Sequence, residues 1–359
     1  MPTSRRAFLE DVSFATLIAG FPEPARAALS RYADKPPEPL FPKALKKGDT
    51  VALVRPASPS FEYEVNEIGA EIVATLGFVP KLTANAGRKY GYLAGTDAER
   101  AADLNAAFAD PKVGAVWCLS GGYGTSRLLP YLDYETIRKN PKPFIGYSDI
   151  TGTLNAIHRL TGLVTFHGPV AESTLSDYSL AAFRKVVMEG GAGRIAEPPP
   201  FTPREGTVDA ENRVWKLAGG KAKGRLVGGN ISVFSTLVGT PFEPELKGRI
   251  LFLEEVGEDP YRIDRWLTQF LLTGKLAGLS GVALGKFEDC DPSRDRGTTL
   301  LGSWSWQEVC ADRLGKLGIP VLAGLCFGHV RDKATLPVGV MAELDADAGT
   351  LTLLEPAVR

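Results

Sequence analysis

Pro143-Phe144-Ile145-Gly146-Tyr147-Ser148-Asp149-Ile150-Thr151 changes character within a few residues. A buried-strand pattern ends at Gly146, a serine follows at a tight corner, and Asp149 opens a helical segment. A strand-to-helix corner of this kind exposes a serine oxygen and points the free N–H groups of the helix at it. Ile150 occupies the fifth position, so the pattern differs from the G-x-S-x-G of α/β-hydrolases. It predicts either a nucleophile elbow at Ser148 or a helix that Ser148 or Asp149 merely caps.

Strands and helices alternate on both sides of this corner. Strand patterns cover residues 50–54, 78–82, 113–119, 144–145 and 163–166. The helical patterns that separate them cover residues 63–76, 96–108, 126–132 and 150–160. Such alternation predicts an α/β domain with a parallel, doubly wound sheet. Ligands bind such sheets at the carboxyl ends of the strands. Ser148 and the loop Gly121-Gly122-Tyr123-Gly124 both fall at such ends.

A proline-rich segment at 197–203 precedes a more strand-rich region. Strand patterns follow it at 250–254, 282–284, 321–323, 341–344 and 350–354. One helical pattern occurs among them, at 263–272. A chain of 359 residues is long enough for two domains with full cores. We therefore expect a second α+β or barrel-like domain after the break.

Composition excludes several classes of protein. The chain is 44% hydrophobic and 23% charged with a net charge of −1, so it lacks the basic stripe of a nucleic-acid binder. No apolar stretch has the length of a membrane span. The four cysteines, Cys118, Cys290, Cys310 and Cys326, show no ligand spacing with histidine, and no H-E-x-x-H occurs. We expect neither a metal nor a cofactor, and we expect Cys118 and Cys326 to be core residues.

The N-terminus reads as a targeting segment. Ser4-Arg5-Arg6-Ala7-Phe8-Leu9, an apolar stretch at 12–21 and Ala25-Arg26-Ala27 resemble, in that order, a twin-arginine export signal with its cleavage site. We expect residues 1–27 to be this signal, residues 28–45 to lead into the first domain, and the protein to be periplasmic. The alternative is an N-terminal amphipathic helix on a cytoplasmic protein.

Three histidines limit the search for a base that could activate Ser148. His158 lies on the helix that follows the serine, roughly 15 Å further along its axis, which is too far. His167 ends the next strand on the same edge of the sheet. His329 follows a strand and a glycine in the second region and could face the serine across a domain interface. Spacing alone does not rank His167 against His329.

A glutamate and a glycine-rich loop complete the candidate site. Glu254 ends the apolar run 250–253, and a carboxylate at the tip of a buried strand is costly unless it is paired. It could orient a histidine, as the acid of a serine triad does. The loop at 121–124 could supply a backbone N–H donor, or it could be only a tight turn. No Gly-Lys-Ser/Thr follows it, which disfavours a Walker-type phosphate site.

Six ordered segments of the chain resemble the LD-carboxypeptidase family, serine peptidases that include muramoyltetrapeptide carboxypeptidase and the microcin C immunity peptidases. They are Gly121–Pro130, Gly146–Thr151, His167-Gly168-Pro169, Gly228-Gly229-Asn230, Leu253–Glu258 and Phe327-Gly328-His329. The resemblance spans residues 46–354. It implies a flavodoxin-like N-terminal domain, which we place at 46–170, and a smaller β-rich C-terminal domain, which we place at 224–359. Residues 171–223 would connect the two.

The resemblance also implies roles for three residues. The nucleophile falls on Ser148, the acid on Glu254, and the base on His329, so that a Ser-Glu-His triad lies between the domains. This ranks His329 above His167, which becomes a neighbour of the substrate.

The oxyanion of the reaction would be held by two N–H groups. We expect them to come from Asp149 and from the Gly121–Gly122 turn, with Tyr123 close to the substrate. The chain departs from the family at Ser120, where arginine is common. That substitution leaves open which cation, for example Arg262, binds the substrate carboxylate.

The implied activity is release of the terminal D-alanine from a murein tetrapeptide. Glu255 replaces an aspartate that is usual in the family, and we expect this difference to matter less. Peptidase activity on modified peptides or peptide–nucleotide conjugates is the alternative within the family, and a non-catalytic ligand-binding protein is the alternative from another class. We also expect a homodimer.

Overall fold

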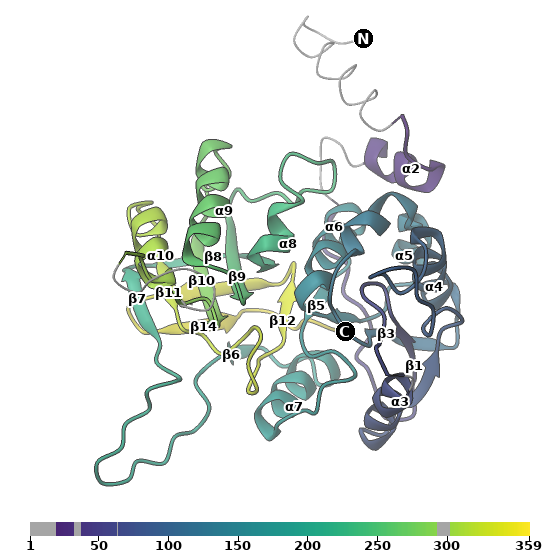
Figure 1. The fold of residues 1–359 in the computed structure, drawn as a ribbon, viewed down its shortest axis with the longest axis horizontal. Coiled ribbons are helices and arrows are strands. Elements are labelled where there is room, and N and C mark those ends of the chain that lie inside the picture. The colour runs from purple at the N-terminus through teal and green to yellow at the C-terminus, as the bar shows by residue number, and fades with distance from the viewer. Residues whose placement is uncertain (1–18, 32–36, 63, 293–301) are drawn as a thin grey trace, which may run out of the picture.

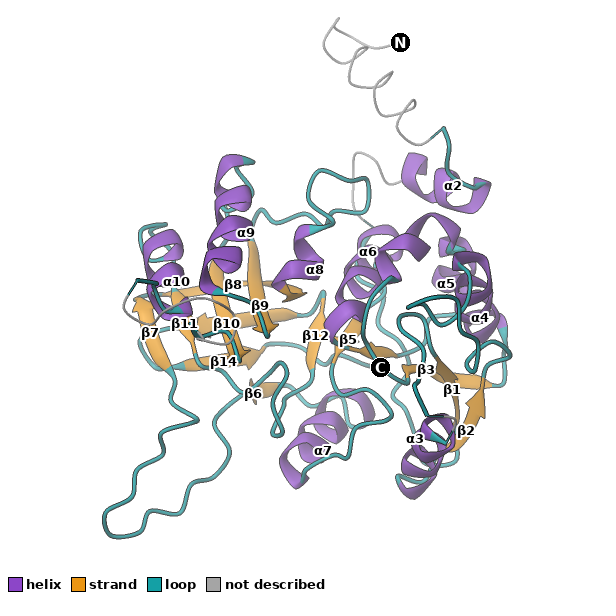
Figure 2. Cartoon of the chain, in the orientation of Figure 1, coloured by secondary structure: helices purple, strands orange, loops and turns teal. Residues whose placement is uncertain are grey.

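Two β-sheets with helices packed around them form the chain (Figures 1 and 2). The computed structural model describes residues 19–31, 37–62, 64–292 and 302–359. The first sheet runs in the order β12-β5-β4-β3-β1-β2, and the second in the order β6-β14-β13-β8-β9-β10-β11-β7. The expected α/β class is confirmed, with a mostly parallel N-terminal sheet and a second, β-rich region.

The first sheet is parallel across five of its strands. These are β1 (Thr50–Val54), β2 (Val79–Leu82), β3 (Val113–Cys118), β4 (Phe144–Gly146) and β5 (Thr165–His167). The sixth strand, β12 (Leu336–Val338), pairs antiparallel with β5 and comes from the far end of the chain. The C-terminal region therefore supplies an edge of the N-terminal sheet, directly beside the strand that ends at His167.

Helices follow the strands of the first region where the patterns predicted them, and one further helix, α5, was not predicted. They are α3 (Val65–Thr75), α4 (Asp97–Ala109), α5 (Tyr134–Lys139), α6 (Thr151–Thr161) and the 3-10 turns η1 (Thr125–Tyr131) and η2 (Ser148–Ile150). A capping box between Thr96 and Glu99 starts α4. The helical pattern at 126–132 becomes a 3-10 helix, and Pro130 inside it removes one backbone donor.

The second sheet carries a parallel centre and antiparallel edges. Its strands are β6 (Gly193–Ile195), β7 (Trp215–Ala218), β8 (Lys221–Asn230), β9 (Arg249–Val256), β10 (Gly281–Glu288), β11 (Val321–Ala323), β13 (Met341–Asp345) and β14 (Thr350–Leu353). Figure 2 shows α8 (Ile231–Ser235), α9 (Pro260–Leu272) and α10 (Trp306–Leu314) on one side of this sheet.

Several of these elements had no clear signal in the sequence. Residues 171–223, expected as a connection, contain α7 (Asp177–Phe183), the π-helical turn η3 (Arg184–Met188) and the edge strands β6 and β7. The pattern of β8 is hidden because lysines, an arginine and glycines interrupt its apolar residues. Partners in the sheet, rather than local propensity, make these segments strands.

A polar junction joins α6 to β8 and so joins the two regions. The Asn155 side chain donates to the Gly228 carbonyl at 2.8 Å and accepts from the Gly228 N–H at 3.2 Å. The Thr151 hydroxyl accepts from the Asn230 N–H at 3.0 Å. A Cβ on Gly229 would lie 2.4 Å from that hydroxyl oxygen. Glycine is required here because the helix that follows Ser148 packs directly on the strand.

The N-terminal helix α2 (Glu23–Arg31) packs on the first region (Figure 1). Ala25, Ala28 and Leu29 are buried, and Phe21 stacks on Phe242 with ring centroids 5.7 Å apart. The expected cleavage site, Ala25-Arg26-Ala27, lies within this helix, whereas the twin-arginine residues Ser4–Leu9 lie outside the described residues. Across the described part of the chain, no helix combines the length and apolarity needed to cross a membrane.

Candidate active site

Ser148 lies at the corner between β4 and α6 with a left-handed backbone, φ 63°. This conformation is rare outside glycine and costs about 1–3 kcal/mol, as the strained turn of a nucleophile elbow does. The alternative that Ser148 or Asp149 caps the helix is not what the structure contains, since neither η2 nor α6 has a side-chain cap. The Asp149 carboxylate instead accepts from the Thr125 N–H at 2.8 Å.

The glycine loop at 121–124 lies against the serine. A Cβ on Gly121 would stand 2.9 Å from the Ser148 Cβ and 3.2 Å from its Oγ. Gly122 has φ 117°, and a Cβ there would lie 2.3 Å from the Ser58 Oγ. That serine oxygen also accepts from the Tyr123 N–H at 3.0 Å. The turn therefore packs directly against Ser148 at Gly121, where a side chain would collide with the Ser148 side chain.

Glu254, on β9, and His329, in the connection between β11 and β12, form a hydrogen-bonded pair. The Glu254 side chain is fully buried, and its Oε2 lies 2.7 Å from Nδ1 of His329. An ionised carboxylate only accepts, so Nδ1 carries the proton and Nε2 is left as the basic nitrogen. A Cβ on Gly328, whose φ is 110°, would lie 2.8 Å from the same oxygen. Glycine at that position permits the close contact.

His167 occupies a different place from His329. It is 1% exposed, and its ring packs edge-on against Tyr147, Phe252 and Phe327. Neither ring nitrogen has a hydrogen-bond partner among the described residues. Burial lowers the pKa of His167 to about 4, although the charge of Glu254 opposes this shift. His167 is thus a neutral, enclosed ring beneath the elbow, and its role toward substrate remains a prediction.

Glu255 supports the strand end that carries Glu254. It is 2% exposed, and burial raises the pKa of its carboxyl. Its oxygens accept from the Asn230 amide at 2.7 Å and from the Ser232 N–H at 3.0 Å, at the start of α8. Parallel pairing of β8 with β9 places Asn230 beside Glu254. The residue that differs from the family's aspartate therefore binds this junction rather than the histidine.

Tyr147 links the serine to two groups of the C-terminal region. Its ring centroid lies 4.8 Å from that of His329. The ammonium of Lys333 lies 4.5 Å from the centre of the same ring and 3.3 Å from its hydroxyl oxygen. Burial, with a further contribution from the charge of Glu254, raises the pKa of Tyr147 to about 12. No motif in the sequence marked Lys333, which lies four residues after His329 in the same loop.

Ser120 meets a cation from another strand. Arg55, at the end of β1, is 3% exposed, and its Nη1 donates to the Ser120 Oγ at 2.6 Å. The same guanidinium donates to Asn66 and to the carboxylate of Glu172, with which it forms an ion pair. An arginine side chain thus lies beside the position where the family often has one, but it is held by protein groups.

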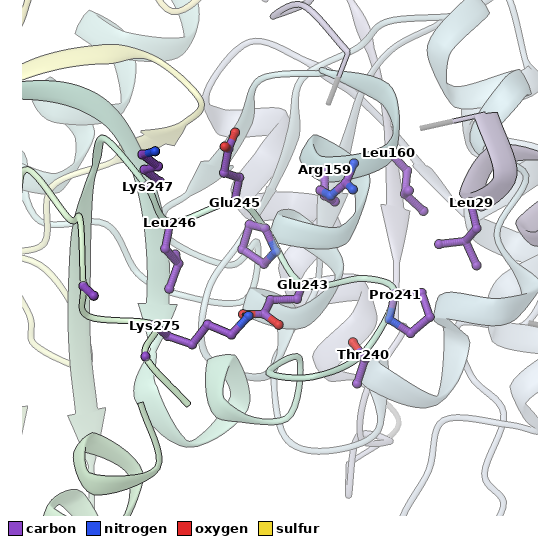
Figure 3. A pocket seen from close by; sticks show the side chains of 13 residues that line it. Leu29, Arg159, Leu160, Thr240, Pro241, Glu243, Glu245, Leu246, Lys247 and Lys275 are labelled. Atoms are coloured by element: carbon purple, nitrogen blue, oxygen red, sulfur yellow. The ribbon is translucent and has the colours of Figure 1, made fainter. Parts of the chain in front are cut away.

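Arg262 is paired with another residue, and the groove in Figure 3 is lined by other residues than the candidate triad. Arg262 pairs with Glu258 at 3.2 Å and is 47% exposed. The groove encloses about 490 Å³, and neither the serine, the glutamate nor the histidine of the candidate triad lines it. Figure 3 shows Lys275 directed at Glu243, with which it forms an ion pair of 2.8 Å, and Leu29 of α2 at the opposite rim. The groove is a junction between α2, α6 and the loops around residues 240–247 and 274–277.

Among the described residues, metal-ligating side chains do not cluster, and the cysteines are buried. No group of three or more metal-ligating side chains occurs in the part of the chain that the structure describes. All four cysteines are free and buried, and burial raises the pKa of Cys118, Cys310 and Cys326. Thiols with raised pKa values are poor nucleophiles at neutral pH.

Two family models match the chain. The LD-carboxypeptidase N-terminal domain matches residues 51–168, and the LD-carboxypeptidase C-terminal domain matches residues 223–344. The chain is 37% identical over 318 residues to the probable murein peptide carboxypeptidase of Bacillus subtilis, covering 87% of this chain and 93% of the relative. It is 34% identical over 301 residues to the murein tetrapeptide carboxypeptidase of Pseudomonas aeruginosa, covering 83% of this chain and 93% of the relative.

A solved structure has the same fold. It is that of MccF in complex with glutamyl sulfamoyl guanosine, with a TM-score of 0.78 and 26% identity over 89% of this chain and all of that one. The matched models span both sheets, and the curated relatives align along nearly their whole length. The chain belongs to the LD-carboxypeptidase family and is a serine-type carboxypeptidase.

Proposed function

We propose that this protein releases the terminal D-alanine of murein tetrapeptides by a Ser148–His329–Glu254 mechanism. The observation that carries the proposal is the 2.7 Å hydrogen bond between buried Glu254 and His329, whose ring contacts Tyr147, the residue before the strained Ser148. The names of the relatives from B. subtilis and P. aeruginosa support murein peptides as the substrate class.

The first half of the reaction acylates the serine. Ser148 Oγ attacks the carbonyl carbon of the bond before the terminal residue, and Nε2 of His329 takes the hydroxyl proton. The intermediate collapses as the C–N bond breaks, and His329 returns the proton to the amine of the leaving D-alanine. Glu254 keeps Nδ1 protonated and stabilises the imidazolium that forms between these steps.

The second half hydrolyses the acyl-enzyme. A water molecule gives its proton to His329 and attacks the ester carbonyl, and Ser148 leaves with the proton restored. In both halves the negative oxygen would lie near the Asp149 N–H and the Gly121–Gly122 turn. Such donors act in a site that excludes water, where each is worth about 3–4 kcal/mol of transition-state stabilisation.

The test is a panel of defined peptides read by mass spectrometry. We expect loss of one D-alanine from muramoyl tetrapeptide and from the free tetrapeptide, and no loss from peptides ending in L-alanine. A matched panel of aminoacyl sulfamoyl nucleosides addresses the alternative substrates, because the structurally similar MccF has been solved with such a ligand. Cleavage confined to the nucleoside panel would replace murein peptides by conjugates as the substrate.

Export and homodimerisation belong to the same proposal. The twin-arginine motif at Arg5 and Arg6 supports export to the periplasm, with the cytoplasm as the alternative. Light scattering of the purified protein tests the homodimer, which a mass equal to one chain would contradict.

A further inference from the structure

A carboxypeptidase must recognise the free carboxylate at the end of its substrate. If the proposed function holds, this protein needs a cation or several N–H or O–H donors near Ser148. The candidate triad and the glycine turn contain no lysine or arginine that could supply this positive charge. Three cations on nearby or expected elements are candidates: Arg55, Arg262 and Lys333.

Two of the three are already paired. Arg55 is buried, donates to Asn66 and Ser120, and forms an ion pair with Glu172. Arg262 is half exposed and forms an ion pair with Glu258 at the start of α9. Each of these guanidinium charges is already balanced by a carboxylate, Glu172 for Arg55 and Glu258 for Arg262.

Lys333 differs because no carboxylate is within ion-pair distance of it among the described residues. Its ammonium is partly buried, and its one hydrogen-bond partner in the described chain is the Tyr147 hydroxyl at 3.3 Å. An ammonium has three donors, so two are unfilled. Burial lowers the pKa of Lys333, whereas the charge of Glu254 raises it. Leaving a partly buried cation without a counter-ion costs free energy that an anionic ligand would recover.

The surrounding contacts fix Lys333 beside the reacting groups. Tyr147 precedes the nucleophile in the chain, and its ring contacts both the His329 ring and the Lys333 ammonium. The Lys333 N–H donates to the buried Ser179 hydroxyl at 2.9 Å, and that hydroxyl donates to the Arg331 carbonyl at 3.1 Å. The loop that carries both His329 and Lys333 is therefore held against α7.

We infer that Lys333, together with the Tyr147 hydroxyl, binds the terminal carboxylate of the substrate and so restricts the enzyme to free peptide ends. The lysine donates two N–H groups to the carboxylate, and Tyr147 donates its O–H. The leaving D-alanine would then lie between Tyr147 and Ser148, with its amine facing His329. Ser120 is not needed for this contact.

The experiment removes the charge of Lys333 and the charge of the substrate carboxylate, separately and together. The tetrapeptide is offered as the free acid and as the terminal carboxamide, to wild type, Lys333→Met, Lys333→Arg and the control Lys216→Met. Lys216 lies on β7 and pairs with Asp347, away from the triad. We expect Lys333→Met to lower kcat/KM for the acid about ten- to hundredfold and to change it for the amide less than about threefold. Lys333→Arg should restore part of the preference for the acid, and Lys216→Met should behave as wild type.

Other outcomes separate the inference from the proposed function. Equal losses on acid and amide in Lys333→Met would make Lys333 a structural residue, and an unchanged preference for the acid would place the carboxylate elsewhere. Either result overturns the inference while wild type still cleaves the tetrapeptide. Calorimetric binding of both peptides to Ser148→Ala, with and without Lys333→Met, gives a readout that needs no turnover. If wild type neither cleaves nor binds the tetrapeptide, the proposed function fails and the inference fails with it.

Discussion

Replacing Glu254 by glutamine removes one charge from the centre of the site and almost nothing else. The carboxylate is fully buried, and its Oε2 lies 2.7 Å from Nδ1 of His329. Glutamine is isosteric, so the packing around Gly328 is retained. The imidazolium that forms as His329 takes the serine proton then loses its counter-charge. At an effective dielectric constant near 20, a unit charge pair about 4 Å apart contributes about 4 kcal/mol.

A loss of about 4 kcal/mol from the transition state corresponds to about a thousandfold in rate. A second effect acts in the same direction. If the glutamine NH₂ faces Nδ1, then Nδ1 must accept, the proton moves to Nε2, and the base is lost. We therefore expect kcat/KM of Glu254→Gln to fall by a factor between about a thousand and ten thousand.

The assay is D-alanine release from the tetrapeptide at saturating and subsaturating concentration. Glu343→Gln on β13 is the control, because that glutamate pairs with Lys221 and Lys223 at the surface of the second sheet. Thermal unfolding of both variants verifies that the fold persists. If folded Glu254→Gln kept more than about a tenth of the wild-type kcat/KM, the electrostatic account of this carboxylate would be refuted.

Three further changes test other parts of the structure. Gly328→Ala places a Cβ 2.8 Å from the Glu254 Oε2 at φ 110°, so we expect at least about a tenfold loss of kcat; wild-type turnover would show that the loop can yield. Burial lowers the pKa of His158 to about 4, below the unfolded value near 6.5, so the unfolded chain binds the extra proton in this window and stability falls as pH drops from about 6.5 toward 4. Urea unfolding of wild type between pH 7 and 5 should therefore lose about 2 kcal/mol more than His158→Gln, and parallel curves would contradict this assignment. Arg5→Lys with Arg6→Lys should retain the protein in the cytoplasm by cell fractionation, and unaltered export would exclude the twin-arginine reading.

The first sheet and the elbow could be predicted because their signals are local. Alternation of apolar strands with helical patterns gives the parallel order, and a glycine before Ser148 marks the corner. The choice between His167 and His329 could not be made from spacing. The structure pairs His329, and not His167, with Glu254, and this contact depends on β12 and on the loop before it, which bring residues from near the C-terminus beside β5.

Long-range pairing also explains what the sequence did not reveal. Asn155 and Thr151 bind the end of β8 at Gly228 and Asn230, and the sequence patterns did not predict this strand. Arg55 and Lys333 could not be identified from the sequence, because neither belongs to a motif. Their relevance follows only from the side chains that surround each charge in the fold. The expected cleavage site at Ala25-Arg26-Ala27 lies in the packed helix α2, so cleavage there would require that helix to open first.

The most direct test of the triad is turnover by Ser148→Ala. Initial rates of D-alanine release from muramoyl tetrapeptide are measured for wild type and variant, each with and without EDTA, alongside thermal unfolding. We expect the variant to be at least about a thousandfold slower with an unchanged unfolding temperature, and EDTA to have no effect on wild type. Residual activity within about tenfold of wild type, or activity lost in EDTA and restored by zinc, would contradict a serine mechanism at Ser148.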